Sequence, residues 1–371
     1  MKETALRIPV ARPVMGEAEA RYALDAIRSG WISSIGRYVN EFEGAFAAYC
    51  GVKHGVTTSN GTVALHLALR TLGVREDDEV IVPDLTFIAV PNAVHYLRAR
   101  PVLVDCDPLT WCLDPELVAA KISPRTRGII AVHSYGGVCD MDAIRRISDA
   151  NGLFVIEDAA EAHGATYQGR RVGGLADVGI FSFYGNKIIT TGEGGMLITN
   201  DDLFAERARF LKDHAMSREH RYVHPEVGYN YRMTNVQAAI GLGQLEQIDS
   251  FLEARDRIAR RYRERLGSLP GITFQEMPTR ARGVCWIFSC LIGDDAPVSR
   301  DRVIEHLAQN GVETRPFFVS LHDQPPYREP DGYPISSRLA RQGLNLPTAV
   351  NLSDEELDRV CGLIAALWLP A

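Results

Sequence analysis

The chain has 371 residues, of which 46% are hydrophobic and 23% are charged, and its formal net charge is −7 at pH 7. The length favours two domains, because a single hydrophobic core stops growing at roughly 250–300 residues. The negative charge argues against broad binding to nucleic acids or to anionic membranes, both of which need a basic surface.

The cysteines indicate neither a zinc site nor a disulfide framework. Seven are scattered without paired spacing, at positions 50, 106, 112, 139, 285, 290 and 361. Free thiols are typical of a reducing compartment. Residues 1–5 do not resemble a signal peptide, and no apolar run approaches the roughly 20 residues needed to cross a bilayer. We expect a soluble cytoplasmic protein without a metal, a nucleic-acid partner or a membrane partner.

Short β-branched runs alternate with helical patterns through the first two thirds of the chain, which is typical of a parallel sheet with crossover helices. Ligands of such sheets bind at the carboxyl ends of the strands, where His133, Asp158 and Ser182 are expected. The predicted strands are 79–83, 101–105, 128–133 and 153–157, and helices between them include 63–72 and 141–150.

A long charged helix is predicted at 235–266, and we place the domain boundary within it, near Gln247. The fold class is therefore α/β, with a large domain of residues 1–247 and a smaller α+β domain of residues 248–371. In the smaller domain we predict a strand at 286–292, a helix at 300–309, and a Pro- and Gly-rich loop at 325–334 that is a candidate lid.

Lys187 has the most informative surroundings in the chain, between an apolar strand-like run and the glycine-rich turn 192–195. Most lysines are hydrated surface charges, but one held beside aromatic residues can lose its proton and bond a carbonyl as a Schiff base. Upstream, the hydrophobic run 155–157 ends at the carboxylate of Asp158. The alternative for Asp158 is an arginine partner or a helix cap. Together the two residues indicate pyridoxal 5′-phosphate (PLP), whose ring nitrogen a carboxylate keeps protonated.

The segment Ser-Asn-Gly-Thr at 59–62 lies between a strand-like run and a helix. Backbone N–H groups at Gly61 and the hydroxyl of Thr62 suit a phosphate, although an ordinary helix cap has the same composition. Ser182 is a further candidate donor to the phosphate. Phe87 is able to stack on a planar ring, and the alternative is a core aromatic. Glu161 is able to contact the phenolic oxygen of the cofactor, and the alternative is a solvated or core-satisfied polar group.

With these motifs in order along the chain, the sequence closely resembles the sugar-nucleotide aminotransferases of the DegT/StrS family, a branch of the fold type I (aspartate-aminotransferase-like) PLP enzymes. The resemblance covers nearly the whole length. The motifs that carry it are 59–62, 78–83, 155–164, 181–195 and 228–234.

The resemblance implies a homodimer with each active site at the subunit interface. It implies Lys187 as the Schiff-base lysine and Asp158 against the pyridine nitrogen. Asn230 matches the position that reaches the phosphate of the neighbouring subunit, a role that the residues alone do not reveal. The remaining implied cofactor contacts are Gly61, Thr62 and Ser182 at the phosphate, Phe87 at the ring and Glu161 at the phenolic oxygen.

Within the family, the segment 182–195 is most similar to enzymes that aminate C4 of GDP-4-keto-6-deoxy-D-mannose to give GDP-perosamine, and Glu193 favours C4 over C3. The segment 31–37 matches the same subgroup. Val319 and Ser320 depart from the commoner His-Pro, which leaves the sugar open. Candidate substrate-binding residues are Arg315, Arg37 and Ser33, since an acidic chain must meet a diphosphate with local arginines.

The implied reaction uses L-glutamate to convert PLP to pyridoxamine 5′-phosphate, which then aminates the keto sugar of a nucleotide-linked substrate. Alternatives are amination of another keto sugar, of a keto-octulosonate or of a cyclitol. A PLP-dependent sugar dehydratase is less favoured, because those relatives replace the lysine with histidine. A non-catalytic PLP-binding regulator lacks support, because no basic DNA-binding extension is present. Use of the product in O-antigen lipopolysaccharide or in a secondary metabolite stays open.

Overall fold

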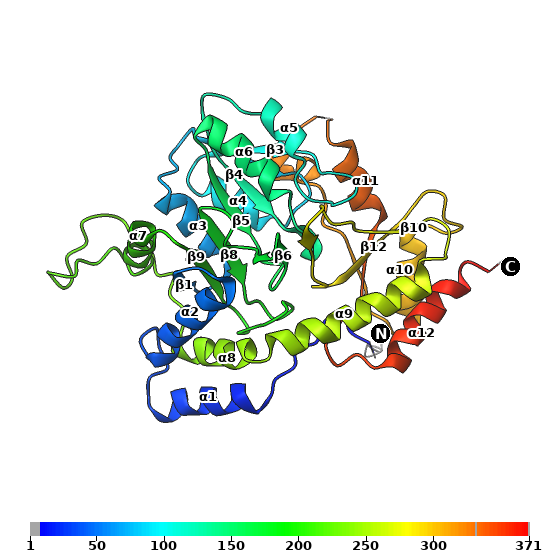
Figure 1. Ribbon diagram of the computed structural model, residues 1–371, viewed down its shortest axis with the longest axis horizontal. Coiled ribbons are helices and arrows are strands. Elements are labelled where there is room, and N and C mark those ends of the chain that lie inside the picture. The colour runs from blue at the N-terminus through cyan, green and yellow to red at the C-terminus, as the bar shows by residue number, and fades with distance from the viewer. Residues whose placement is uncertain (1–7, 331, 370–371) are drawn as a thin grey trace.

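The computed structural model describes residues 8–330 and 332–369, so residues 1–5 of the expected N-terminus and Asp331 of the predicted loop lie outside the described part. A seven-stranded sheet forms its centre, in the order β1-β9-β8-β5-β4-β2-β3 (Figure 1). Only β9 runs against its neighbours, which confirms a mainly parallel sheet. The strands are β1 (His54–Thr58), β2 (Glu79–Pro83), β3 (Arg100–Val104), β4 (Thr126–Val132), β5 (Phe154–Asp158), β8 (Val178–Ser182) and β9 (Gly195–Thr199).

Both faces of this sheet are covered by helices, because successive strand residues point to opposite sides and both sets are apolar. In β2, Val80 and Val82 pack in one core and Ile81 packs in another. The first core includes α3 (Gly61–Thr71), α4 (Ala89–His95) and α7 (Asp202–Lys212). The second includes α2 (Arg37–Cys50), α5 (Pro115–Ala120), α6 (Met141–Asn151) and α8 (Asn235–Leu245).

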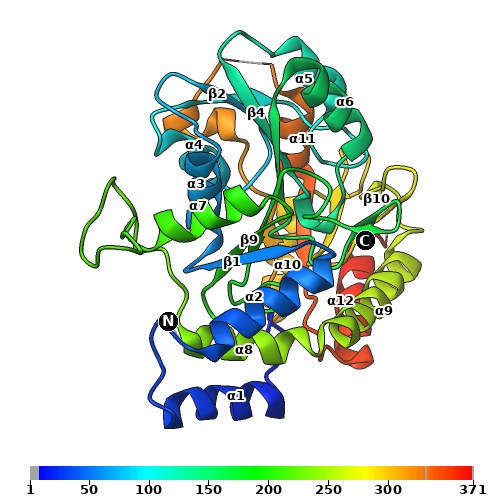
Figure 2. The ribbon, with the colours of Figure 1, turned by 60° about the vertical axis from the view of Figure 1, so that its left-hand side comes forward.

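The predicted helix 235–266 is wrong as a single element, because the chain forms α8 and a separate α9 (Ile248–Leu266). Gln247 between them has ψ 1°, outside the helical range. Its side-chain amide donates to the carbonyl of Gly243 at 3.2 Å and to Glu19 of α1 (Glu17–Arg28) at 2.9 Å, and so supports the break. Figures 1 and 2 show α1 beneath α8, whereas α9 turns away to pack beside α12 (Asp354–Ala366). The domain boundary near Gln247 stays a prediction.

The C-terminal part is built on a second, four-stranded sheet in the order β10-β12-β14-β13. A third core forms there between α9, α10 (Arg300–Gln309) and α12, and Ile8 near the N-terminus joins it. The predicted strand 286–292 begins two residues later, at Phe288, and the sequence pattern missed the shorter strands. The predicted strand is β12 (Phe288–Ile292), and the missed strands are β10 (Ile272–Phe274), β13 (Arg315–Pro316) and β14 (Gly343–Leu346). The helix α11 (Pro334–Gln342) precedes β14.

The two parts of the chain also touch through backbone. A small sheet joins β6 (Thr166–Tyr167), β7 (Arg170–Arg171) and β11 (Ala281–Arg282). Nearby, the N–H of Val284 donates to the carbonyl of Gly136 at 2.8 Å. Gly136 has φ +85°, and a Cβ there would lie 2.0 Å from the carbonyl oxygen of Val284. Glycine is therefore required at this crossing.

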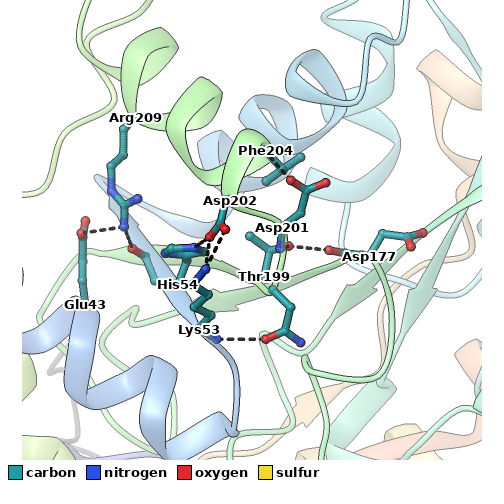
Figure 3. Close-up of polar contacts among 11 residues, drawn as sticks. Glu43, Lys53, His54, Asp177, Thr199, Asp201, Asp202, Phe204 and Arg209 are labelled. Carbon is teal, nitrogen blue, oxygen red and sulfur yellow. Dashed lines mark hydrogen bonds and ion pairs between the residues drawn. The ribbon is translucent and has the colours of Figure 1, made fainter.

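Polar side chains fix β1 to the start of α7, as Figure 3 shows. Lys53 donates to Asp202 at 2.6 Å, and His54 lies 2.5 Å from the other oxygen of the same carboxylate. Arg209 donates to the carbonyl of Gly55 at 2.8 Å. Asp201 caps α7 by accepting the N–H of Phe204 at 3.0 Å. These contacts hold the helix that leads into the loop carrying Asn230.

A buried ion pair joins α2, β1 and α7. The Glu43 carboxylate accepts from Lys212 at 3.0 Å and from the N–H and hydroxyl of Thr57, both at 2.8 Å. Burial alone would raise the pKa of Glu43, but Lys212 and Thr57 lower it below its ordinary value. Stability from this group is therefore present at neutral pH and is lost as the pH falls through the lowered pKa.

Two further observations concern the cysteines and the apolar character of the helices. All seven cysteines are free, as expected. Among residues 8–330 and 332–369, no helix has both the length and the apolar character needed to span a bilayer.

Replacing Lys212 with Met should destabilise the protein, because it leaves Glu43 buried without its amine. We expect a loss of about 3 kcal/mol in the free energy of unfolding at pH 7, at the low end for a broken buried pair, because Arg209 still lies 3.6 Å from Glu43. Urea unfolding measures the loss. The double variant Lys212→Met with Glu43→Gln should recover part of it, and a single variant as stable as the wild type would contradict the argument.

Candidate active site

The carboxyl ends of the parallel strands gather the polar groups of the site at one edge of the sheet. β4 ends just before His133, β5 ends at Asp158 and β8 ends at Ser182. β1, which runs in the same direction, leads into the start of α3 at Gly61. Gly61 and Ser182, which are 121 positions apart in the sequence (182 − 61), therefore meet at this edge, where ligands of such sheets bind.

The Lys187 amine lies close to a carboxylate and an indole ring. Its side chain is only 11% exposed, and Nζ lies 3.9 Å from Oε1 of Glu161. Nζ also lies 4.0 Å from the centre of the Trp286 ring. Burial lowers the pKa of the amine, and the charges of Glu161 and Asp158 oppose this change. A lowered pKa leaves more of the amine neutral, which is the form that attacks a carbonyl.

Asp158 is a buried carboxylate that keeps one oxygen available. Oδ1 accepts the N–H of Ala160 at 3.0 Å, whereas Oδ2 accepts no hydrogen bond from the described residues. Burial raises the pKa of this carboxyl, and the Ala160 N–H, Lys187 and His133 oppose the rise. A buried carboxylate beside the amine, with an oxygen to spare, suits a cationic ring nitrogen.

Glu161 is fixed by the backbone of an adjacent turn. Its Oε2 accepts the N–H of Tyr135 at 2.7 Å, and Tyr135 holds the left-handed conformation, with φ 55°. Burial raises the pKa of Glu161 to about 7, against the opposing charge of Lys187. The carboxyl therefore takes or gives a proton near neutral pH.

The start of α3 provides an anion site. Asn60 caps the helix by accepting the N–H of Val63 at 3.0 Å, whereas the N–H groups of Gly61 and Thr62 have no partner among the described residues. A Cβ added to Gly61 would lie 3.0 Å from Cβ of Ser182, so the serine stands directly beside the helix end. Free N–H groups, the positive helix end and a hydroxyl together fit a phosphate.

Phe87 belongs to an aromatic wall that the C-terminal part completes. Its side chain is 54% exposed, and its ring lies 5.7 Å from Phe318. Phe318 in turn lies 5.3 Å from Tyr135, whose ring also stacks on Phe317 at 4.2 Å. An exposed ring at this edge is available to cover a planar cofactor.

A buried pair of His133 and Glu157, which the sequence did not reveal, lies next to Asp158. Nδ1 of His133 accepts the N–H of Cys139 at 3.2 Å, so the proton is on Nε2, which donates to Glu157 at 3.1 Å. The N–H of His133 also donates to the carbonyl of Asp158 at 3.0 Å. The only signal in the sequence was the position of His133 at a strand end.

The four other candidates form no hydrogen bond or ion pair with Lys187 within the part of the chain that the structure describes. Asn230 accepts from Arg232 at 3.1 Å in the loop between α7 and α8. Arg37 pairs with Asp25 at 3.0 Å, the carbonyl of Ser33 accepts from Asn235 at 2.6 Å, and Arg315 lies 3.5 Å from Glu313. Their roles toward the cofactor or the substrate stay predictions.

Known proteins are similar to this chain over nearly its whole length. The sequence model of the DegT/DnrJ/EryC1/StrS aminotransferase family matches residues 13–365. GDP-perosamine synthase of Caulobacter vibrioides is 49% identical over 97% of each chain. The putative pyridoxal phosphate-dependent aminotransferase EpsN of Bacillus subtilis is 38% identical over 98% of this chain and 96% of its own. The crystal structure of DesV from S. venezuelae has a TM-score of 0.90 and 36% identity over 95% of each chain.

Replacing Ser182 with Ala should weaken the binding of PLP, because it removes a hydroxyl beside the free N–H groups of α3. We expect the dissociation constant to rise about 10-fold, as for the loss of one hydrogen bond to a charged group. Titration of cofactor-free protein with PLP, followed by absorbance, measures it. Ser250→Ala, on the exposed surface of α9, is the matched control. An unchanged constant in the Ser182 variant would exclude this serine from the phosphate site.

Proposed function

We infer the function of this chain from its family: the chain belongs to the DegT/DnrJ/EryC1/StrS aminotransferase family and is a PLP-dependent aminotransferase. We propose that it transfers the amino group of L-glutamate to C4 of a nucleotide-linked 4-keto-6-deoxy sugar. The substrate we infer is GDP-4-keto-6-deoxy-D-mannose, and the product is GDP-perosamine. Support comes from the C. vibrioides GDP-perosamine synthase, which matches 97% of this chain at 49% identity.

The buried amine of Lys187 beside the Glu161 carboxylate carries the proposal. A transaminase needs a base that accepts a proton from one substrate carbon and returns it to another atom nearby. An amine that is 11% exposed and lies 3.9 Å from a carboxylate satisfies this need, because it is shielded from water and its pKa is lowered. The histidine expected in a sugar dehydratase of this family is absent from position 187.

The other site residues would bind the cofactor and orient it. Asp158 would hold a proton on the ring nitrogen, and PLP, when bound, supplies an electron-accepting ring to the reacting carbon. Gly61, Thr62 and Ser182 would hold the phosphate, and Phe87 would cover the ring. Glu161 would contact the phenolic oxygen, with a pKa of about 7 that allows it to donate or accept there.

Arg315, Arg37 and Ser33 remain the proposed contacts of the sugar nucleotide. A chain with net charge −7 must meet a diphosphate with local arginines. Asn235 supports the segment that carries Ser33 and Arg37, because its side chain accepts the N–H of Tyr38 at 3.0 Å and donates to the carbonyl of Trp31 at 2.6 Å. A fixed segment suits a substrate contact.

We also propose a homodimer in which Asn230 reaches the phosphate site of the partner. The loop between α7 and α8 projects away from the sheet (Figure 1) and carries Tyr222 and Val227, which are 73% and 78% exposed. Near α1, Trp31 and Ile35 are 58% and 67% exposed. Large exposed apolar side chains in such numbers favour a protein interface over solvent.

A cytoplasmic location and use of the product in O-antigen lipopolysaccharide complete the proposal. The seven free cysteines support a reducing compartment. The use of the product rests only on the inferred sugar.

The substrate proposal predicts selective amination of a GDP-linked sugar. The purified yellow enzyme should convert GDP-4-keto-6-deoxymannose and glutamate to an amino sugar nucleotide and 2-oxoglutarate, both measured by mass spectrometry. Uracil- and thymine-linked 4-keto sugars should react at least about 100-fold more slowly, since a base edge left unpaired costs several kcal/mol. Lys187→Ala is the inactive control. A preference for a thymine-linked sugar would contradict the proposal.

The interface proposal predicts complementation between two defective subunits. Lys187→Ala and Asn230→Ala homodimers should each be nearly inactive, whereas mixed dimers contain one site with both residues intact. After unfolding and refolding as an equal mixture, activity should return to about one quarter of wild type, from statistical pairing of subunits in a twofold dimer. Light scattering checks the dimer. No recovery in proven mixed dimers would place Asn230 in its own subunit's site or outside both.

A further inference from the structure

Trp286 covers the Lys187 amine and comes from the C-terminal part of the chain. It lies two residues before β12 and is only 4% exposed. The centre of its ring lies 4.0 Å from Nζ of Lys187. At this distance a protonated amine is attracted by the negative face of the indole. None of the motifs that carry the family resemblance contains this tryptophan, so the resemblance implies no role for it in the reaction.

Two hydrogen bonds fix the ring relative to the lysine. The indole N–H donates to the carbonyl of Asn186, the residue before Lys187, at 2.9 Å. The carbonyl of Trp286 accepts from the Arg255 guanidinium of α9, which is 4% exposed. The tryptophan is therefore held from both sides, by the loop that carries the lysine and by the first helix of the C-terminal part.

Burial and the charges around the amine act in opposite directions. Burial disfavours the ammonium, whereas the charges of Glu161 and Asp158 favour it. His163 is also close, but burial lowers its pKa to about 3, so it is neutral and adds no charge. Among these neighbours, the carboxylates stabilise an ammonium but also take up protons themselves. The indole ring stabilises an ammonium and does not titrate.

We propose that Trp286 is a positioning residue. After the Lys187 amine takes a proton from the substrate carbon, the indole ring holds the resulting ammonium within reach of the reacting atoms. The C–H bond of the substrate breaks, its electron pair stays on carbon, and the proton goes to the lone pair of Nζ. Nζ would later give the same proton to C4′ of the bound cofactor, which leaves the amine neutral again. This inference rests on the aminotransferase activity and is independent of which sugar is used.

The test measures the titration of Lys187 directly. Protein loaded with pyridoxamine 5′-phosphate, which has no carbonyl to bond the lysine, is labelled with acetic anhydride at a series of pH values, and acetylation of Lys187 is quantified by mass spectrometry. Only the neutral amine reacts. Removal of the ring in Trp286→Leu should shift the labelling midpoint down by about 1 pH unit, and Trp286→Phe should shift it less, because the attraction is weaker over phenylalanine.

A second measurement separates positioning from packing. In Trp286→Leu, the single-turnover rate with glutamate should fall at least about 10-fold near neutral pH and its pH profile should move with the labelling midpoint, while the PLP dissociation constant stays within about twofold. Trp368→Phe is the matched control, because Trp368 donates to the carbonyl of Pro270 at 2.8 Å on the exposed surface.

The outcome that overturns the proposal is a labelling midpoint in the Trp286 variants equal to that of the wild type, whatever the activity. If Trp286→Leu does not fold, as judged by circular dichroism, the comparison of Trp286→Phe with the wild type decides alone. A protein that is active on a different sugar but shows the expected shift would refute the substrate proposal and leave this inference intact.

Discussion

The rest of the structure depends on one buried contact, which joins the Lys187 amine to the Glu161 carboxylate at the edge where the parallel strands end. Lys187 is 11% exposed and lies 3.9 Å from Glu161, with Asp158 close enough to affect its titration. Buried charges are tolerated only when their partners are fixed. Backbone N–H groups fix both carboxylates: that of Ala160 holds Asp158 and that of Tyr135 holds Glu161.

That contact is completed from the distant end of the chain. The ring of Tyr135 stacks on Phe317 at 4.2 Å, and its hydroxyl accepts the N–H of Phe318 at 2.9 Å. Trp286 covers the amine itself. A shift of the C-terminal part relative to the large sheet would therefore move the groups around Lys187, which links the packing of the two parts to the chemistry of the site.

Local sequence patterns predicted the elements that carry the site but not the contacts between them. β2 at 79–83 and α10 at 300–309 were predicted with the observed bounds, because their apolar periods and caps are local signals. The break at Gln247 was missed, since it depends on a side chain that bonds Glu19 far away in sequence. Trp286 was assigned to a strand, and its ring over Lys187 arises only from tertiary packing across 99 positions of sequence.

The crossing of Gly136 and Val284 limits how such a protein is able to diversify. Any side chain at 136 would lie 2.0 Å from the carbonyl oxygen of Val284, so this position is closed to substitution. The crossing fixes the two parts of the chain against each other through backbone, so their alignment there does not depend on the neighbouring side chains.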